Sequence, residues 1–169
     1  MENLVQNAIQ ILNVSKTFPG MKRPALNNIS ASLRQGIITG LVGPDGAGKT
    51  TLIRLMAGLL LPTKGVINVM GDDTVKQSNH LHEITGYMPQ KFGLYEDLTV
   101  MENLEFYAKL HGLSGQDKKN TFDRMLTFTS LTPFTHRLTD KLSVGMKQKL
   151  GLACALLGRP KVLLLDEPS

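Results

Sequence analysis

An α/β fold with a mainly parallel sheet is predicted by three features of the sequence. A glycine-rich loop at residues 43–50 separates a short apolar run from a segment with helical spacing. Two more apolar runs, at 84–90 and 162–165, have the composition of buried strands, and a long stretch with helical periodicity separates them. Strands that alternate with helices in this way form a sheet covered by helices.

Length, charge and cysteine content narrow the class of protein. The 169 residues, 41% of them hydrophobic, suit one domain with a real core, and the apolar stretches are too short to span a bilayer. No secretory signal is visible at the N-terminus, and the single Cys154 fits a buried thiol in the cytoplasm. The net charge of +5 is scattered and no aromatics interleave it, so we expect no direct nucleic-acid partner.

The N-terminal part predicts a small antiparallel sheet. Apolar residues alternate over 8–14 and 25–33, with Pro19-Gly20 between them, so one face of this pair is expected to be wet. Separately, a strand bounded by glycines is expected at 65–71, after the first helix. Phe18 lies on the connection, where its ring could stack on a nucleotide base or cover the core; the residues alone favour the core.

The pattern G-x-x-x-x-G-K-T at 43–50 is typical of a loop that binds phosphate groups. A buried strand is predicted at 37–42 before it, and a helix at 50–60 after it, as this motif requires. Glycines would let successive N–H groups point at one anion, and the helix N-terminus would add to the attraction. The predicted binding residues are Gly43, Pro44, Asp45, Gly46, Ala47, Gly48, Lys49, Thr50 and Thr51.

Within this loop, Lys49 is expected to reach the β- and γ-phosphates, and the Thr50 hydroxyl to bind Mg²⁺. The acidic residues of such a site are expected at the end of the 162–165 strand. Asp166 would hold Mg²⁺ there, and Glu167 would polarise the attacking water as a general base. Because carboxylates are costly to bury, both are expected to face a polar site.

Residues 92–157 are predicted to form a helical insertion between strands. Thr99 and Glu102 form a capping box that opens a helix at 100–111, and further helices are expected at 115–129 and 143–157. The predicted division is therefore a core of 5–91 and 158–169 with a helical subdomain of 92–157. Gln90 emerges at the end of the strand that precedes the insertion.

In its motifs the chain resembles the ATP-binding subunit of ABC transporters. The phosphate loop, Gln90 as the Q-loop glutamine, Leu142-Ser143-Val144-Gly145-Met146 as the signature sequence and Leu163 to Glu167 as the Walker B strand follow in the family's order. The resemblance spans residues 5–169. The stretches at 40–49, 86–90 and 98–104 look like those of bacterial drug-efflux exporters.

The resemblance implies an ATPase whose cofactors are ATP and Mg²⁺ and which works as a pair of nucleotide-binding units. Each ATP would lie between one unit's phosphate loop and the other's signature residues Ser143 and Gly145. Phe18 would then stack on adenine, and Gln90 would contact Mg²⁺ and water. The implied partners are a second nucleotide-binding domain and a transmembrane permease subunit, at the cytoplasmic face of the inner membrane.

Two departures from the family pattern are visible. Val144 stands where the signature has its first glycine, and Met146 where it has glutamine. A branched Cβ would crowd an approaching phosphate and disfavour positive φ, so a weakened ATP site is expected. The sequence also stops just past Glu167, before the family's D-loop and switch histidine. A truncated, poorly stable and nearly inactive chain is therefore expected.

Two other functions stay open, and one is disfavoured. A soluble ABC-type ATPase acting on nucleic acid or ribosomes would be expected to carry long insertions or basic tails, which are not seen here. A noncatalytic nucleotide-binding module is favoured by Val144 and by the missing motifs. A phosphate-loop GTPase is disfavoured because no N-K-x-D guanine motif occurs.

Overall fold

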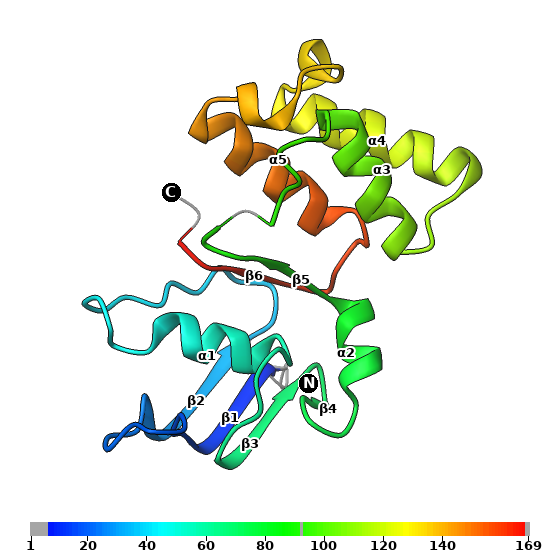
Figure 1. The fold of residues 1–169 in the computed structure, drawn as a ribbon. Coiled ribbons are helices and arrows are strands. Elements are labelled where there is room, and N and C mark those ends of the chain that lie inside the picture. The colour runs from blue at the N-terminus through cyan, green and yellow to red at the C-terminus, as the bar shows by residue number, and fades with distance from the viewer. Residues whose placement is uncertain (1–6, 92, 168–169) are drawn as a thin grey trace. The chain divides into compact units, whose positions relative to one another are not determined.

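The structure is a computed structural model that describes residues 7–91 and 93–167. Contacts within the chain group it into two compact units, Met1–His82 and Glu83–Ser169. Figure 1 traces the chain through both units. Each unit has its own sheet and its own core.

The first unit is built on an antiparallel sheet with the strand order β2-β1-β3-β4 (Figure 1). Its strands are β1 (Asn7–Lys16), β2 (Leu26–Arg34), β3 (Lys64–Val69) and the short β4 (Asp72–Asp73). The predicted pairing of 8–14 with 25–33 is confirmed, with Gln10 opposite Ser32. β4 was not predicted, because a pair of aspartates carries no strand signal.

Alternation along β1 fixes which face of this sheet is buried. Ile9 and Ile11 are buried whereas Leu12 is exposed, which confirms the expected wet face. The alternation slips by one residue at Asn13, whose positive φ of 50° marks a register shift. Asparagine adopts this left-handed conformation at low cost, and the shift returns Val14 to the buried face.

Helix α1 (Lys49–Met56) follows the glycine-rich loop. It buries Leu52, Ile53, Leu55 and Met56, so apolar spacing and packing agree. The prediction that this helix continues to residue 60 is wrong. Gly58 takes a φ of 70°, and its N–H and that of Leu59 donate to carbonyls of the last turn, a C-terminal cap that ends the helix early.

The strand predicted at 37–42 is not formed, so this prediction is wrong. The segment has no strand geometry, and Ile38 and Val42 are almost fully exposed to solvent. A strand needs neighbours that accept and donate its backbone hydrogen bonds, and among the described residues no strand pairs with this segment. The apolar composition of a segment can indicate a buried strand, but it does not show whether another strand is available to pair with it.

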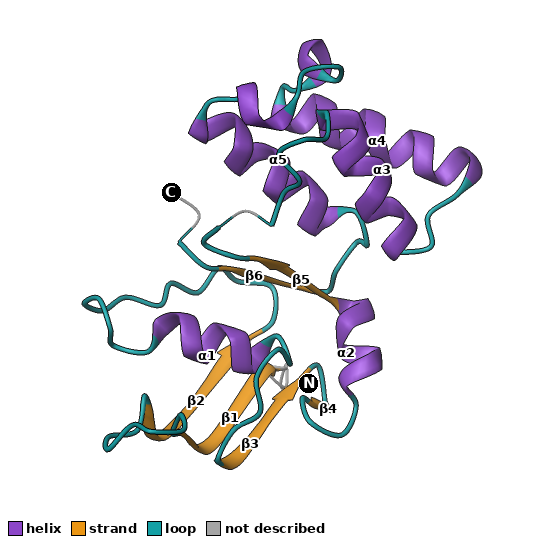
Figure 2. Ribbon diagram, in the orientation of Figure 1, coloured by secondary structure: helices purple, strands orange, loops and turns teal. Residues whose placement is uncertain are grey.

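The second unit contains a parallel pair, β5 (Thr85–Met88) and β6 (Val162–Leu165), with Tyr87 opposite Leu164. Helix α2 (Ser78–Ile84) leads into β5 across the boundary between the units, and it was not predicted. The short 3₁₀ turns η1 (Thr132–Phe134) and η2 (Thr139–Lys141) lie in the connections. Along the chain, β5 and β6 are separated by three helices, which Figure 2 draws as purple ribbons. They are α3 (Val100–Leu110), α4 (Gly115–Thr129) and α5 (Val144–Leu156).

The three helices share one apolar core and match the predicted helical stretch closely. The capping box at Thr99 and Glu102 is present in full. Hydrogen bonds that the Thr99 N–H and hydroxyl donate to the Glu102 carboxylate lower the pKa of Glu102. No helix among the described residues is long and apolar enough to cross a membrane. The core residues are Val100, Leu104, Ala108, Phe122, Met125, Leu126, Leu131, Leu142, Leu150, Ala153, Cys154 and Leu157.

Strand β6 was expected to be buried on both faces, and this is only half right. Val162 and Leu164 are buried, whereas Leu163 is exposed. Successive side chains of a strand point to opposite faces, so one face of β6 is covered and the other is not. The sequence pattern indicates the strand correctly but overstates its burial in this unit.

Gly86 allows α5 to pack closely against β5, which gives a testable expectation. A Cβ at this position would lie 2.5 Å from the Ala155 carbonyl oxygen. Gly86→Ala should therefore destabilise the full-length protein by roughly 1–3 kcal/mol, as overpacking does. Urea unfolding would measure the change. Gly145→Ala is the matched control, because a Cβ there meets nothing within 4 Å; equal midpoints for the two variants would contradict the packing argument.

Candidate nucleotide-binding site

The glycine-rich loop has the backbone that anion binding requires at two of its three glycines. Gly46 has a φ of 76°, and Gly48, the N-cap of α1, has a φ of 94°. A Cβ at Gly48 would also lie 2.7 Å from the Ala25 carbonyl oxygen. Gly43 was also expected to need a conformation closed to other residues, and this is wrong. Its φ is not positive, and a Cβ would make only ordinary contact with Ala47 at 3.5 Å.

The Lys49 side chain lies back over this loop. Its Nζ donates to the Gly43 carbonyl oxygen at 2.9 Å and to the Pro44 carbonyl oxygen at 3.0 Å, and it is 3.9 Å from Asp45 Oδ1. The ammonium group is therefore held at the loop by carbonyl oxygens and one carboxylate. An anion seated on the loop's amides would meet this positive charge directly.

Helix α1 starts at Lys49, one residue before the predicted start, and its first turn includes Thr50 and Thr51. Among the described side chains none caps this N-terminus, and its first turn contains no acidic residue. Backbone N–H groups of a first turn have no partner within the helix. The start of α1 thus offers amides and a positive dipole end to an anion.

Phe18 lies outside the buried core of the first unit. It is partly buried, and the Lys16 ammonium lies 5.1 Å from the centre of its ring. The residues alone favoured a role in covering the core, and a partly buried ring leaves both that role and base stacking as predictions. An aromatic ring that keeps part of its surface in solvent can still accept a flat ligand.

Gln90 and Glu167 are brought together in the second unit. Gln90 Nε2 donates to Glu167 Oε2 at 2.6 Å, although 77 positions separate the two residues. The contact follows from the parallel pairing of β5 with β6, in which Met88 lies opposite Leu165, so both strands end at the same edge. This contact uses the amide nitrogen of Gln90 and the carboxylate of Glu167.

Asp166 is buried, with 1% of its surface exposed, and this corrects the expectation that both carboxylates escape burial. Its backbone N–H donates to the Met88 carbonyl oxygen at 3.0 Å, which extends the pairing of the two strands by one step. Glu167 alone is exposed. The strand end therefore places one carboxylate inside the protein and the next one at its surface.

Ser143 is the N-cap of α5, and its Oγ accepts a hydrogen bond from the Met146 N–H at 3.3 Å. Val144 is the first helical residue and 67% of its surface is exposed, so its predicted conflict with positive φ does not arise. The branched side chain nevertheless stands beside Gly145 at the start of the helix. Crowding of a phosphate by Val144 stays a prediction.

A magnesium site was predicted from Thr50, Gln90 and Asp166, and the chemistry of these donors fits the metal. Mg²⁺ prefers oxygen ligands, takes few from protein and completes its shell with phosphate and water. A hydroxyl, an amide oxygen and a buried carboxylate supply such ligands. Across residues 7–91 and 93–167, no three His, Cys, Asp or Glu side chains gather at one point.

Several contacts of the signature segment were not predicted from the sequence. Lys147 Nζ lies 2.6 Å from Glu96 Oε1, and Met146 packs against the helical core.

Asn103, on α3, is completely buried, and this was not predicted either. Its signal was visible in the sequence, because Val100, Asn103, Leu104 and Ala108 follow the spacing of one buried helix face, on which an amide is exceptional.

Burial shifts the pKa of three groups, Tyr107, His111 and Cys154, that line a small cavity between β5, α3 and α5. It raises the pKa of Tyr107 to about 12, lowers the pKa of His111 and raises the pKa of the Cys154 thiol. All three therefore favour their neutral forms at pH 7. The buried Cys154 is as expected, and a protonated thiol is a poor nucleophile.

Comparison with known proteins defines the class. The family described as "ABC transporter" matches residues 26–169, so the chain belongs to this family and has its ATP-binding cassette fold. A solved ATP-binding cassette, MJ0796, in a dimeric post-hydrolysis state bound to ADP and Pi, has a TM-score of 0.84 at 27% identity. The alignment covers 95% of this chain and 74% of that one.

Among curated relatives, the chain is 60% identical to the probable multidrug ABC transporter ATP-binding protein YbhF of Escherichia coli (strain K12). The match covers 97% of this chain and 28% of that protein. It is 38% identical to the bacitracin transport ATP-binding protein BcrA of Bacillus licheniformis, over 95% of this chain and 51% of BcrA. The chain thus spans about a quarter to a half of these relatives.

Proposed function

We propose that this chain binds and hydrolyses ATP with Mg²⁺ and thereby powers an ABC-type exporter. The observation that carries the proposal is the phosphate loop, in which two left-handed glycines precede an uncapped helix N-terminus and Lys49 lies over the loop's own carbonyls. The amides would hold the phosphates and Lys49 would neutralise their charge. Names of the relatives support the transport role and the drug-efflux class.

In this proposal each nucleotide is shared by two nucleotide-binding domains, each of which is one copy of this chain or a related domain. The phosphate loop of one, with Phe18 beside the base, would face Ser143 and Gly145 of the other. Dimeric MJ0796 bound to ADP and Pi supports this arrangement. Residues 92–157 would act as the helical subdomain against a core of 5–91 and 158–169. A transmembrane permease would hold the pair at the cytoplasmic face of the membrane.

Thr50, Gln90 and Asp166 would hold the magnesium ion, which would supply charge neutralisation at the phosphates when bound. Glu167 would accept the proton of the attacking water. The hydrogen bond that Gln90 Nε2 donates to Glu167 Oε2 holds this carboxylate in one orientation. An exposed carboxylate that is held in one orientation is suited to the role of general base.

Calorimetry of the full-length protein with Mg-ATP tests the binding step, and phosphate release tests hydrolysis. Uptake of ATP with slow release of phosphate is expected. Absence of any heat of binding would overturn the proposal. Co-purification then separates a transport ATPase from a soluble ATPase that acts on nucleic acid or ribosomes. A membrane protein bound to the chain would support the transport role, whereas bound nucleic acid or ribosomes would support the soluble ATPase.

The exposed Val144 favours a second candidate, a degenerate unit that binds ATP but turns it over slowly. Val144→Gly removes the branched side chain at the start of α5 and should raise ATP turnover by up to about tenfold, or about 1.4 kcal/mol of activation free energy. Steady-state phosphate release measures this. Val75→Gly, at an exposed valine of the first unit, is the control; equal rates for wild type and Val144→Gly would refute the crowding argument.

A further inference from the structure

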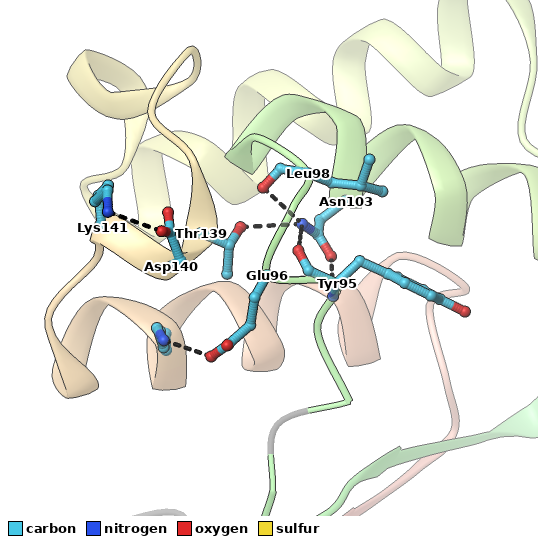
Figure 3. A network of polar contacts seen from close by, with 8 residues as sticks. Tyr95, Glu96, Leu98, Asn103, Thr139, Asp140 and Lys141 are labelled. Carbon is cyan, nitrogen blue, oxygen red and sulfur yellow. Dashed lines mark hydrogen bonds and ion pairs between the residues drawn. The ribbon is translucent and has the colours of Figure 1, made fainter.

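Asn103, on the fourth position of α3, is the centre of a buried polar cluster in the second unit (Figure 3). None of its surface is exposed. Its Oδ1 accepts from the Tyr95 N–H at 2.9 Å, and its Nδ2 lies 2.9 Å from the Tyr95 carbonyl oxygen and 3.1 Å from that of Thr99. One side-chain amide thus satisfies both backbone groups of Tyr95 and fixes the 95–99 loop.

The same amide also reaches a second loop. Asn103 Nδ2 lies 3.0 Å from Thr139 Oγ1, and Thr139 is fully buried as well. The Thr139 N–H donates to the Leu98 carbonyl oxygen at 2.9 Å. Burying an amide and a hydroxyl costs free energy unless they are bonded, so these contacts stabilise one particular pairing of the two loops.

Backbone contacts strengthen that pairing at the start of α3. The N–H groups of Val100 and Met101 have no acceptors within their helix, and they donate to the carbonyl oxygens of Arg137 and Thr135 at 3.1 Å and 3.0 Å. The loop at 135–141 therefore acts as the cap of α3. It cannot shift along the helix without leaving these amides unpaired.

The loop at 135–141 leads directly into the signature residues. Thr139 opens η2, which ends two residues before Ser143, and the Leu142 N–H donates to the Thr139 carbonyl oxygen at 3.2 Å. A second connection is the ion pair between Lys147, near the start of α5, and Glu96, which Figure 3 labels. The start of α5 is thus connected twice to the 95–99 loop.

We propose that Asn103 and Thr139 are positioning residues, which fix Ser143 and the N-terminus of α5 in the orientation that receives a partner unit's nucleotide. The proposal rests on the function proposed above, because it assigns the signature segment to that nucleotide. The hydrogen bonds of the Asn103 and Thr139 side chains join them to Tyr95, Leu98, Thr99 and one another. Their loss should therefore weaken productive pairing of two units and leave Mg-ATP binding by the loop intact.

Thr139→Val and Thr139→Ser form a matched pair for the test in the full-length protein. Valine keeps the shape but removes the hydroxyl that Asn103 contacts, whereas serine keeps the hydroxyl. Thr139→Val should lower kcat/KM for ATP roughly tenfold, with the calorimetric Kd for Mg-ATP unchanged. Thr139→Ser should stay close to wild type. Asn103→Ala should resemble Thr139→Val, and if it does not fold, the threonine pair carries the test.

The possible outcomes separate this inference from the proposed function. If wild type takes up no Mg-ATP, the proposed function fails. If wild type hydrolyses ATP and Thr139→Val does so at the same rate, only the positioning role is overturned. A rate that falls equally in Thr139→Ser and Thr139→Val, or a Kd that weakens in parallel with the rate, would also overturn it, because the hydroxyl would then have no specific effect.

Discussion

Lys49→Ala is expected to abolish Mg-ATP binding at concentrations that saturate the wild-type protein. The substitution removes the only ammonium that lies on the described phosphate loop, where Nζ contacts the Gly43 and Pro44 carbonyl oxygens. Loss of several charge-assisted contacts to phosphate should weaken binding at least about 100-fold. Isothermal titration calorimetry of the full-length protein measures this directly.

Lys64→Ala is the matched control, because Lys64 is an exposed lysine of the same unit and lies on β3. It should bind Mg-ATP as the wild type does. Thermal unfolding of both variants shows whether they remain folded. A well-folded Lys49→Ala protein that binds Mg-ATP with wild-type affinity would contradict the assignment of this loop.

Glu167→Gln is expected to keep ATP binding and to stop turnover. Glutamine has nearly the same shape, and its amide oxygen can still accept the hydrogen bond from Gln90, so the geometry of the strand end should survive. What is lost is the negative charge that accepts a proton from water. Removal of a general base typically costs about 10² to 10⁴ in rate. Single-turnover hydrolysis, measured beside calorimetric binding, separates the two effects.

Glu83→Gln supplies the control for Glu167→Gln, since Glu83 is an exposed glutamate on α2. Its turnover should equal that of the wild type. If Glu167→Gln lost ATP binding to the same extent as Lys49→Ala, the separation of a binding lysine from a catalytic carboxylate would be wrong. Wild-type turnover in Glu167→Gln would remove the carboxylate from the mechanism.

Local sequence signals predicted those elements whose stability is local. The capping box at Thr99 and Glu102 marked the start of α3, and the predicted 115–129 matches α4 residue for residue. Alternation predicted the pairing of β1 with β2, although not the shift at Asn13. In each case the pattern and the packing of one face agree, so little tertiary information was needed.

Elements that depend on distant partners were less predictable. The run at 37–42 has strand composition but no strand pairs with it among the described residues, and composition cannot report that. Helix α1 ends at Met56 because Gly58 takes a left-handed conformation, whereas apolar spacing alone continued further. α2 was missed since its polar residues carry a weak helical signal.

The candidate site shows the same division. Motif spacing placed the loop, Lys49, Gln90 and Glu167 without tertiary information, because these residues lie at predicted ends of strands and helices. The hydrogen bond between Gln90 and Glu167 depends on the pairing of β5 with β6, which no local pattern specifies. Asn103 was overlooked because its partners lie in two loops.

The parallel pairing of β5 with β6 has a consequence for biosynthesis. The whole of α3, α4 and α5 must leave the ribosome before Leu164 can meet Tyr87. At roughly 5–20 residues per second this is a delay of several seconds, during which β5 stays unpaired while the helices can already collapse on one another. Translation speed across the helical segment should therefore affect how much chain reaches its native state.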